Sequence, residues 1–250
     1  MKIYYNLITL IFFPFCQIQG QIVINEILAS NLNYREDNYG DYDDLIELHN
    51  TTNDTINLEG YFLSDNQDDL TKWAFPYNDS LFVLLPQDYV ILWADNEPFQ
   101  GQDHLSFSFS KDGESIFLVS PNGSTIIDQI SFPKQFADIS YGRDALNNND
   151  WSYFISPTIG TQNSIGFEGV LDMPTLTPQG GVSAQMTPVS MINNNSVGDI
   201  YYTLDGGIPT TNDLIFENQI NILNTTVING KSFNNNFIPS YSNSHLYLID

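Results

Sequence analysis

The stretch "YGDYDDLIELHN" (residues 39–50) places three carboxylates, Asp41, Asp43 and Asp44, directly before an alternating run of apolar and polar residues. Alternation with a period of two is typical of a β-strand, so the carboxylates are expected in the loop that enters it. Acidic clusters of this density occur in metal sites and in paired-carboxylate active sites, as well as in solvated loops. The alternating run therefore predicts a β-strand, and the acidic loop before it is a candidate functional site.

Short strand-like runs of the same kind continue along the chain. They are rich in β-branched and aromatic residues and are bounded by turn residues, which predicts many short strands and an all-β sandwich. "SPNGST" carries Asn122–Gly123 between two such runs, a strong hairpin signal. No helical stripe is present. The runs are "QIVINEIL", "DLIELHN", "FVLLPQDYVILWAD", "SIFLVSP" and "TIIDQISF".

The strand pattern is interrupted near residues 162–181. Pro174, Pro178 and Gly180–Gly181 punctuate a segment with little periodicity, as expected of a linker. Strand patterning then resumes. The sequence therefore predicts one β-sandwich over residues 21–163, a linker over 164–173 and a second β-sandwich over 174–250.

The first 20 residues have the layout of a secretory signal peptide. Lys2 precedes a short apolar run, and the polar "QIQG" ends in a small residue. The run is short for a membrane span. We therefore expect cleavage near Gly20–Gln21 and a mature chain, without a transmembrane segment, that is secreted or held at the cell surface.

The charge and cysteine content of the mature chain exclude several classes of function. Without Lys2 it has six basic residues against 30 acidic ones, a formal charge of −24, which disfavours binding to nucleic acid or to anionic lipid. The single cysteine, Cys16, lies in the predicted signal peptide. The mature chain therefore has no disulfide, no thiolate metal site and no cysteine nucleophile.

Residues 21–163 resemble the lamin tail domain in the form found in exported bacterial proteins. The family motifs D-W-I-E-L-x-N, L-x-G-[WY]-x-L-S-D and S-x-G-R…W…P-T-P-G-x-x-N appear in order, with Leu45 in place of Trp and Ile159 in place of the second Pro. The resemblance implies an immunoglobulin-like β-sandwich without known catalytic residues. The segments that carry it are "VINEILASN", "DYDDLIELHN", "INLEGYFLSDN", "KWAFP", "YVILWADN", "HLSFSFSKDGESIFLVSPNG", "DQISFP" and "ISYGRDALNNNDWSYFISPTIGTQN".

Residues 174–250 resemble the small C-terminal domain of chitobiases and β-hexosaminidases. "IYYTLDGGIPTT" resembles its signature Y-Y-T-x-D-G-x-x-P-T, and "PTLTPQGGVSA" and "TTVINGKSFNNNFIPS" resemble its entry and closing segments. Asn229–Gly230 and Asn236 depart from the small residues and the glycine usual there. The resemblance implies a second immunoglobulin-like sandwich, an accessory domain that does not itself hydrolyse sugar.

For the acidic loop, the favoured interpretation is a solvated loop without a metal or other cofactor. The alternative is a calcium site with Asp41, Asp43 and Asp44 as ligands, since calcium needs six to eight oxygens. "DNYGDYDD" supplies oxygens but lacks the D-x-D-x-D-G order and distal Glu of a standard calcium loop. A paired-carboxylate hydrolase would need one acid kept protonated in an apolar pocket, which the sequence does not indicate.

The remaining candidate residues are aromatic. Trp73, Trp93, Tyr201 and Tyr202 are candidates for a ligand platform that stacks on sugar rings, although their places in the family motifs favour core packing. Three histidines at positions 49, 104 and 245 have no metal-binding spacing, and no nucleophile elbow or phosphate-binding loop is present. No catalytic residue is predicted.

The leading functional hypothesis is a non-catalytic exported module pair that serves in extracellular binding, adhesion or domain presentation. One alternative is the N-terminal accessory region of a larger exported enzyme, a spore-coat-kinase-like (CotH-type) protein or a hydrolase, whose catalytic domain lies beyond residue 250. That alternative rests on analogy, because this domain pair precedes such a domain in some exported bacterial proteins. The other is a stand-alone carbohydrate-binding protein. The sequence names no partner; cell-surface polysaccharide or protein is the class expected.

Overall fold

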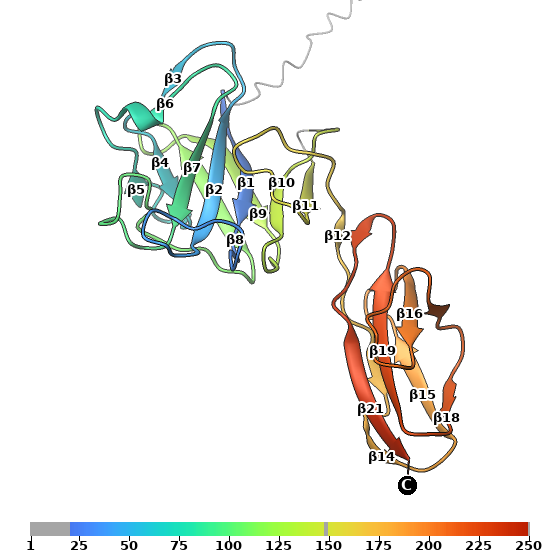
Figure 1. Ribbon diagram of the computed structural model, residues 1–250. Coiled ribbons are helices and arrows are strands. Elements are labelled where there is room, and N and C mark those ends of the chain that lie inside the picture. Colours follow the sequence, from blue (N-terminus) through green and yellow to red (C-terminus); the bar gives the residue numbers. More distant parts are fainter. Residues whose placement is uncertain (1–20, 148–149, 250) are drawn as a thin grey trace, which may run out of the picture.

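The computed structural model of the protein describes residues 21–147 and 150–249, which form strands and loops (Figure 1). Among these residues there is no α-helix, and the one helical turn is a 3-10 turn at Ser80–Phe82. The prediction of an all-β chain is therefore confirmed. The predicted signal peptide, residues 1–20, lies outside the described residues.

Two sheets and a short strand pair make up the N-terminal part, and all their pairings are antiparallel. The larger sheet, in the order β11-β10-β1-β2-β7, contains β1 (Ile22–Leu28), β2 (Asp44–Asn50), β7 (Tyr89–Ala94), β10 (Ser140–Arg143) and β11 (Trp151–Phe154). The smaller, in the order β5-β4-β8-β9, contains β4 (Phe62–Ser64), β5 (Trp73–Ala74), β8 (Glu114–Val119) and β9 (Ile126–Phe132). The separate pair is β3 (Ile56–Asn57) with β6 (Val83–Leu84).

Strand β2 is covered on both faces. Ile46 and Leu48 point into the main hydrophobic core, which also contains alternate residues of β8 from the smaller sheet. Leu45 packs on the opposite side, in a separate cluster with Leu28 and Trp93. The strand predicted from the alternation is thus confirmed, and its second face is buried as well, with Tyr34 packed against the Leu45 cluster.

The hairpin predicted at Asn122–Gly123 joins β8 to β9. Gly123 has a φ of 71°, and the Asn122 side chain accepts hydrogen bonds from the backbone N–H groups of Ser124 and Thr125, both at 2.9 Å. A residue with positive φ is easily accommodated by glycine, which explains the tight turn at this position.

Two further sheets form the C-terminal part. One, in the order β13-β15-β18, contains β13 (Thr175–Thr177), β15 (Thr187–Ile192) and β18 (Ile220–Ile222). The other, in the order β14-β21-β19-β16-β17, contains β14 (Gly181–Ser183), β16 (Asp199–Thr203), β17 (Leu214–Ile215), β19 (Thr226–Phe233) and β21 (Asn243–Ile249). Their shared core consists of Leu176, Val189, Met191, Ile200, Ile222, Ile228 and Tyr247.

The segment over residues 164–173 connects the two parts and contains a strand of its own. Within it, β12 (Gly169–Val170) pairs in parallel with β20 (Phe237–Ile238), which belongs to the C-terminal part. In Figure 1, β12 lies between the two groups of sheets. The connection that the sequence predicts as a linker is therefore paired with the C-terminal part through β12.

Candidate functional site

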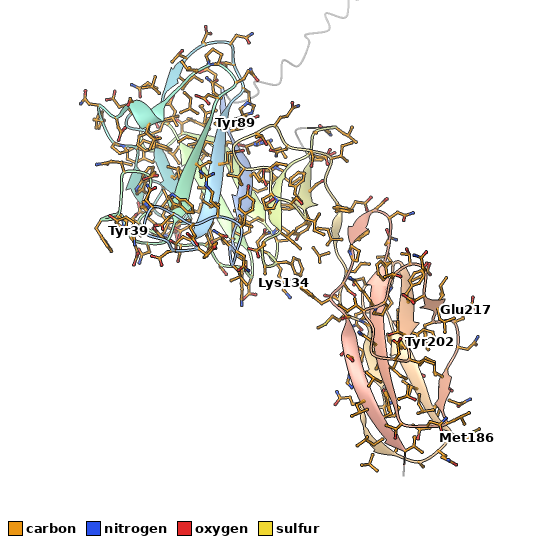
Figure 2. All side chains as sticks on the ribbon, in the orientation of Figure 1. Tyr39, Tyr89, Lys134, Met186, Tyr202 and Glu217 are labelled. Atoms are coloured by element: carbon orange, nitrogen blue, oxygen red, sulfur yellow. The ribbon has the colours of Figure 1, made fainter. Side chains whose placement is uncertain are left out.

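The acidic loop before β2 brings three carboxylates together. One oxygen from each of Asp37, Asp41 and Asp43 lies within 4.8 Å of the other two, a set that we call the acidic group. The loop stands at the surface of the N-terminal part, where the exposed Tyr39 marks it in Figure 2. Three carboxylates at this separation are able to share one cation.

The structure replaces one member of the candidate set derived from the sequence. Asp44, the first residue of β2, is not part of the acidic group, and its carboxylate accepts hydrogen bonds from the backbone amides of Asn31 and Phe109. Burial raises the pKa of Asp44 to about 7, and those hydrogen bonds act in the opposite direction. Asp37, which precedes the quoted stretch, takes its place in the set.

Asp37 is held in a defined orientation and is shielded from solvent. Its Oδ1 accepts hydrogen bonds from the backbone N–H groups of Tyr39 and Asp41, both at 2.8 Å. Its Oδ2 lies 4.0 Å from Nε2 of His104, and the two side chains are 0% and 1% exposed, respectively. The other ring nitrogen of His104 is in close contact with Oδ2 of Asp95. A histidine that appears isolated in the sequence thus lies at the acidic loop.

The environment of Asp43 disfavours its charged form. Burial, followed by the charges of Asp95, Asp37, Asp41 and Glu97, raises its pKa to about 6. This is the shift expected for a carboxylate among like charges. One oxygen of this side chain, Oδ2, is buried and accepts no hydrogen bond.

A second concentration of carboxylates lies inside the larger sheet. Glu26 on β1 and Glu47 on β2 are fully buried. Oε1 of Glu26 accepts hydrogen bonds from Ser140 and from the backbone N–H of Thr158, and Oε2 accepts one from the Thr158 hydroxyl. Glu47 accepts from the Asn25 side chain and from the backbone N–H of Gly160. The two carboxylates therefore anchor the closing segment of the N-terminal part.

Burial is the largest influence on both glutamates. It raises the pKa of Glu26, and it raises the pKa of Glu47 to about 8, although hydrogen bonds to each carboxylate act in the opposite direction. Buried carboxyls with raised pKa values occur in active sites as well as in structural networks. Here their oxygens are occupied by donors from the protein, which favours the structural role.

A polar pocket of about 410 Å³ opens beside this network. Its lining includes His49, whose ring stacks on Tyr89 at a centroid distance of 4.3 Å. The Nε2 atom of His49 is buried and makes no hydrogen bond, and burial lowers the pKa of this histidine. The other lining residues are Val23, Asn25, Thr51, Gln87, Arg143, Ala145, Gln162 and Asn163.

Comparison with family models gives two matches along the chain. Residues 17–134 match the Lamin Tail Domain model, and residues 178–242 match the Chitobiase/beta-hexosaminidase C-terminal domain model. The chain carries a lamin tail domain followed by a chitobiase-type C-terminal domain. This order is the one that the sequence motifs predict. Searches of curated proteins and of solved structures gave no match.

Both matched families are non-catalytic modules. In this chain, the sheets of the two domains extend past the matched residues. β10 and β11 follow residue 134 and complete the larger sheet of the lamin tail domain. β21 follows residue 242 and lies inside the second sheet of the chitobiase-type domain.

No helix in the described part of the chain is both long enough and apolar enough to cross a bilayer.

The aromatic candidates divide between the two domains. In the lamin tail domain, Trp73 and Trp93 are only 8% and 6% exposed and belong to buried clusters, so they serve the core rather than a ligand platform. In the chitobiase-type domain, Tyr201 and Tyr202 are half-buried on β16. Tyr202 contributes to a shallow pocket of about 480 Å³, and Figure 2 shows where it lies.

Asp37 and the two buried glutamates were not among the candidates chosen from the sequence, and His104 was set aside because the histidines lack metal-binding spacing. Asp37 and His104 meet only because the segment around Asp95 folds back on the acidic loop. The burial of the two glutamates could have been predicted from the sequence. Glu26 and Glu47 each interrupt a strongly apolar strand, and a charge inside such a strand indicates a buried partner.

Proposed function

We propose that this chain is an exported, non-catalytic module pair that holds two immunoglobulin-like sandwiches at a defined spacing outside the cell. Its role is to present or position what is attached to it, or what binds to it. Support comes from the family matches, since both are non-catalytic modules, and from the signal-peptide layout of residues 1–20. The observation that carries the proposal is the connection between the two domains.

Backbone hydrogen bonds tie the connection to both sides. Phe167 exchanges two hydrogen bonds with Tyr153 of β11, at 2.8 and 2.9 Å. Two residues further on, β12 pairs with β20, and the Leu171 N–H donates to the Ile238 carbonyl at 3.0 Å. The backbone N–H and C=O groups of a flexible tether are hydrogen-bonded to water. In this connection they are hydrogen-bonded to the two domains instead.

Side chains from both domains also meet around the connection. Ile139 and Tyr153 from the lamin tail domain pack with Ile238 from the chitobiase-type domain, and Phe167 and Val170 of the connection pack against them. We call these five residues the connector cluster. An apolar contact that spans two domains opposes their independent motion, because separating them exposes apolar area to water.

Glycines in the connection serve this packing. A Cβ added at Gly166 would lie 2.4 Å from the Cβ of Ser152, and one at Gly169 would lie 2.9 Å from the Phe237 ring. A side chain would therefore push the segment away from its neighbours. These glycines permit close approach, in contrast to the flexibility that glycine-containing linkers usually provide.

We expect the distance between the two domains to be narrowly distributed, and we expect Ile238→Ser to broaden it. The Ile238 side chain is 3% exposed, so serine removes apolar contact from the connector cluster. The chain from Gln21 onward has no cysteine, so spin labels placed at Asn53→Cys and Thr211→Cys would be the only labels. Double electron–electron resonance measures the distance distribution directly.

The matched control is Ile208→Ser, which makes the same chemical change at a side chain that is 68% exposed. It should leave the distribution unchanged. A broad distribution in the unmodified chain would refute the spacer role and would make the connection a flexible tether.

We also expect the purified chain from Gln21 onward to show no turnover of chromogenic hexosaminides, phosphoesters or peptides, and no phosphate transfer from ATP. Both domain families lack catalytic residues, and the oxygens of the two buried glutamates already accept hydrogen bonds from the protein. Turnover that survives repurification and is lost in a single Asp or Glu variant would contradict the non-catalytic assignment.

A further inference from the structure

The acidic group contains buried carboxylate oxygens that no protein group satisfies. Oδ2 of Asp37 and Oδ2 of Asp43 are both buried without a hydrogen-bond partner, and the Asp37 side chain is 0% exposed. Because Oδ1 of Asp37 already accepts two backbone hydrogen bonds, Oδ2 is the oxygen left for another ligand. Buried charges in proteins are normally paired or coordinate a metal, since leaving them bare costs solvation energy.

His104 does not supply the missing partner. Its Nε2 lies 4.0 Å from Oδ2 of Asp37, beyond the 2.7–3.2 Å range of an N–H···O hydrogen bond. Its Nδ1 is already in contact with Asp95. A single imidazolium would in any case balance only one of the charges around Asp43, whose neighbours Asp95, Asp37, Asp41 and Glu97 are all acidic.

We propose that Asp37, Asp41 and Asp43 bind a calcium ion. The ion meets one oxygen from each carboxylate, and water and loop carbonyl oxygens complete its coordination. It joins the loop at Asp37 to the chain that enters β2, and it satisfies the two oxygens that the protein leaves bare. The site is independent of the spacer role, because none of its residues belongs to the connector cluster.

The donor set favours calcium over other common divalent ions. All three protein ligands are carboxylate oxygens, whereas structural zinc sites are dominated by cysteine and histidine. Their ligand oxygens all lie within 4.8 Å of one another, so one ion can meet all three at the calcium–oxygen distance of roughly 2.4 Å. Magnesium demands near-octahedral geometry and gives up its water reluctantly, so it is usually held by only one or two carboxylates.

Thermal melting of the chain from Gln21 onward tests the proposal. At about a hundredfold excess of calcium over its dissociation constant, the melting temperature of the lamin tail domain is expected to be about 5–10 °C higher than in chelator. The same concentration of magnesium should give a much smaller rise. The triple variant Asp37→Asn, Asp41→Asn, Asp43→Asn should lose the calcium-specific rise.

A control with the same change in net charge separates ligation from relief of charge repulsion. Asp68, Asp112 and Asp199 are exposed and lie outside the acidic group, and their replacement with Asn should leave the calcium-specific rise intact. If this control loses the rise as well, calcium acts through overall charge and the proposal is wrong. An equal response to calcium and magnesium in the unmodified chain would also overturn it.

Terbium luminescence keeps the proposal testable if the triple variant does not fold. The rings of Tyr39 and Trp93 both lie 6.3 Å from His104, close enough to the acidic group to sensitise a bound lanthanide on ultraviolet excitation. The unmodified chain should show one saturable terbium site that calcium displaces. Asp41→Asn, at the exposed member of the group, should weaken terbium binding at least tenfold. Absence of sensitised emission, or emission that calcium does not displace, would overturn the proposal.

Discussion

Replacing Glu47 with alanine is expected to lower the free energy of unfolding of the lamin tail domain by about 3 kcal/mol. The change removes the acceptor for the buried Asn25 side chain and for the backbone N–H of Gly160, whose hydrogen bond is partly buried. Each buried donor left without a partner costs about 1–3 kcal/mol, and the deleted side chain leaves a cavity. Removing the carboxyl group also removes the free-energy cost of keeping it buried, and this offsets part of the loss. Chemical denaturation monitored by tryptophan fluorescence measures the difference.

The control for this variant is Glu217→Ala, which removes an exposed glutamate of the chitobiase-type domain that Figure 2 labels. It should change stability by less than about 0.5 kcal/mol. If Glu47→Ala were equally neutral, the buried glutamate would not anchor the closing segment at Gly160, and the structural role assigned to it would be wrong.

The second large effect is a loss of stability as the pH rises from about 5 to about 8. The pKa of Glu47 is raised to about 8 and that of Asp44 to about 7, so the folded chain holds protons that the unfolded chain has released. Stability is therefore fully present below the unfolded pKa values near 4, and it is lost as the pH rises through the folded values. Glu47 alone should account for about 3 kcal/mol over this interval, at about 1.4 kcal/mol per pH unit.

Carboxylates with lowered pKa values do not cancel this trend. The pKa values of Asp138 and Asp144 are lowered by hydrogen bonds, so the stability that they contribute is lost only on acidification below about pH 4. Denaturation at a series of pH values, at constant ionic strength and with chelator, tests the prediction. Glu47→Gln, which does not titrate, should have a visibly shallower slope. Constant or rising stability between pH 5 and 8 would show that the hydrogen bonds to Glu47 outweigh its burial.

Local features of the sequence were sufficient for the strands and for the class of fold. The alternation in "DLIELHN" predicted a strand that the structure has as Asp44–Asn50, with Ile46 and Leu48 facing the main core. Asn122–Gly123 predicted the turn between β8 and β9. These features depend on residues adjacent along the chain, where side-chain direction and backbone torsion angles are set locally. The ordered motifs likewise predicted both domain families.

The membership of the candidate site depended on the tertiary structure. Neighbouring residues at a strand end point in opposite directions, so Asp43 joins the acidic group while Asp44 turns to the backbone amides of Asn31 and Phe109. Asp37 meets His104 because hydrogen-bonded strands bring together segments far apart in the sequence.

The sequence by itself determined an all-β chain with a lamin tail domain and a chitobiase-type domain, because strand periodicity, turn residues and family motifs are written in consecutive residues. Only the tertiary structure decided what covers the second face of β2 and what holds the connection. Glu47 is buried because the segment at Gly160 closes over it, and Gly166 is a packing position because β11 lies against it. Burial and close approach depend on which residues lie nearby in space. The hydrophobic periodicity of one strand does not show which distant segments will pack against it.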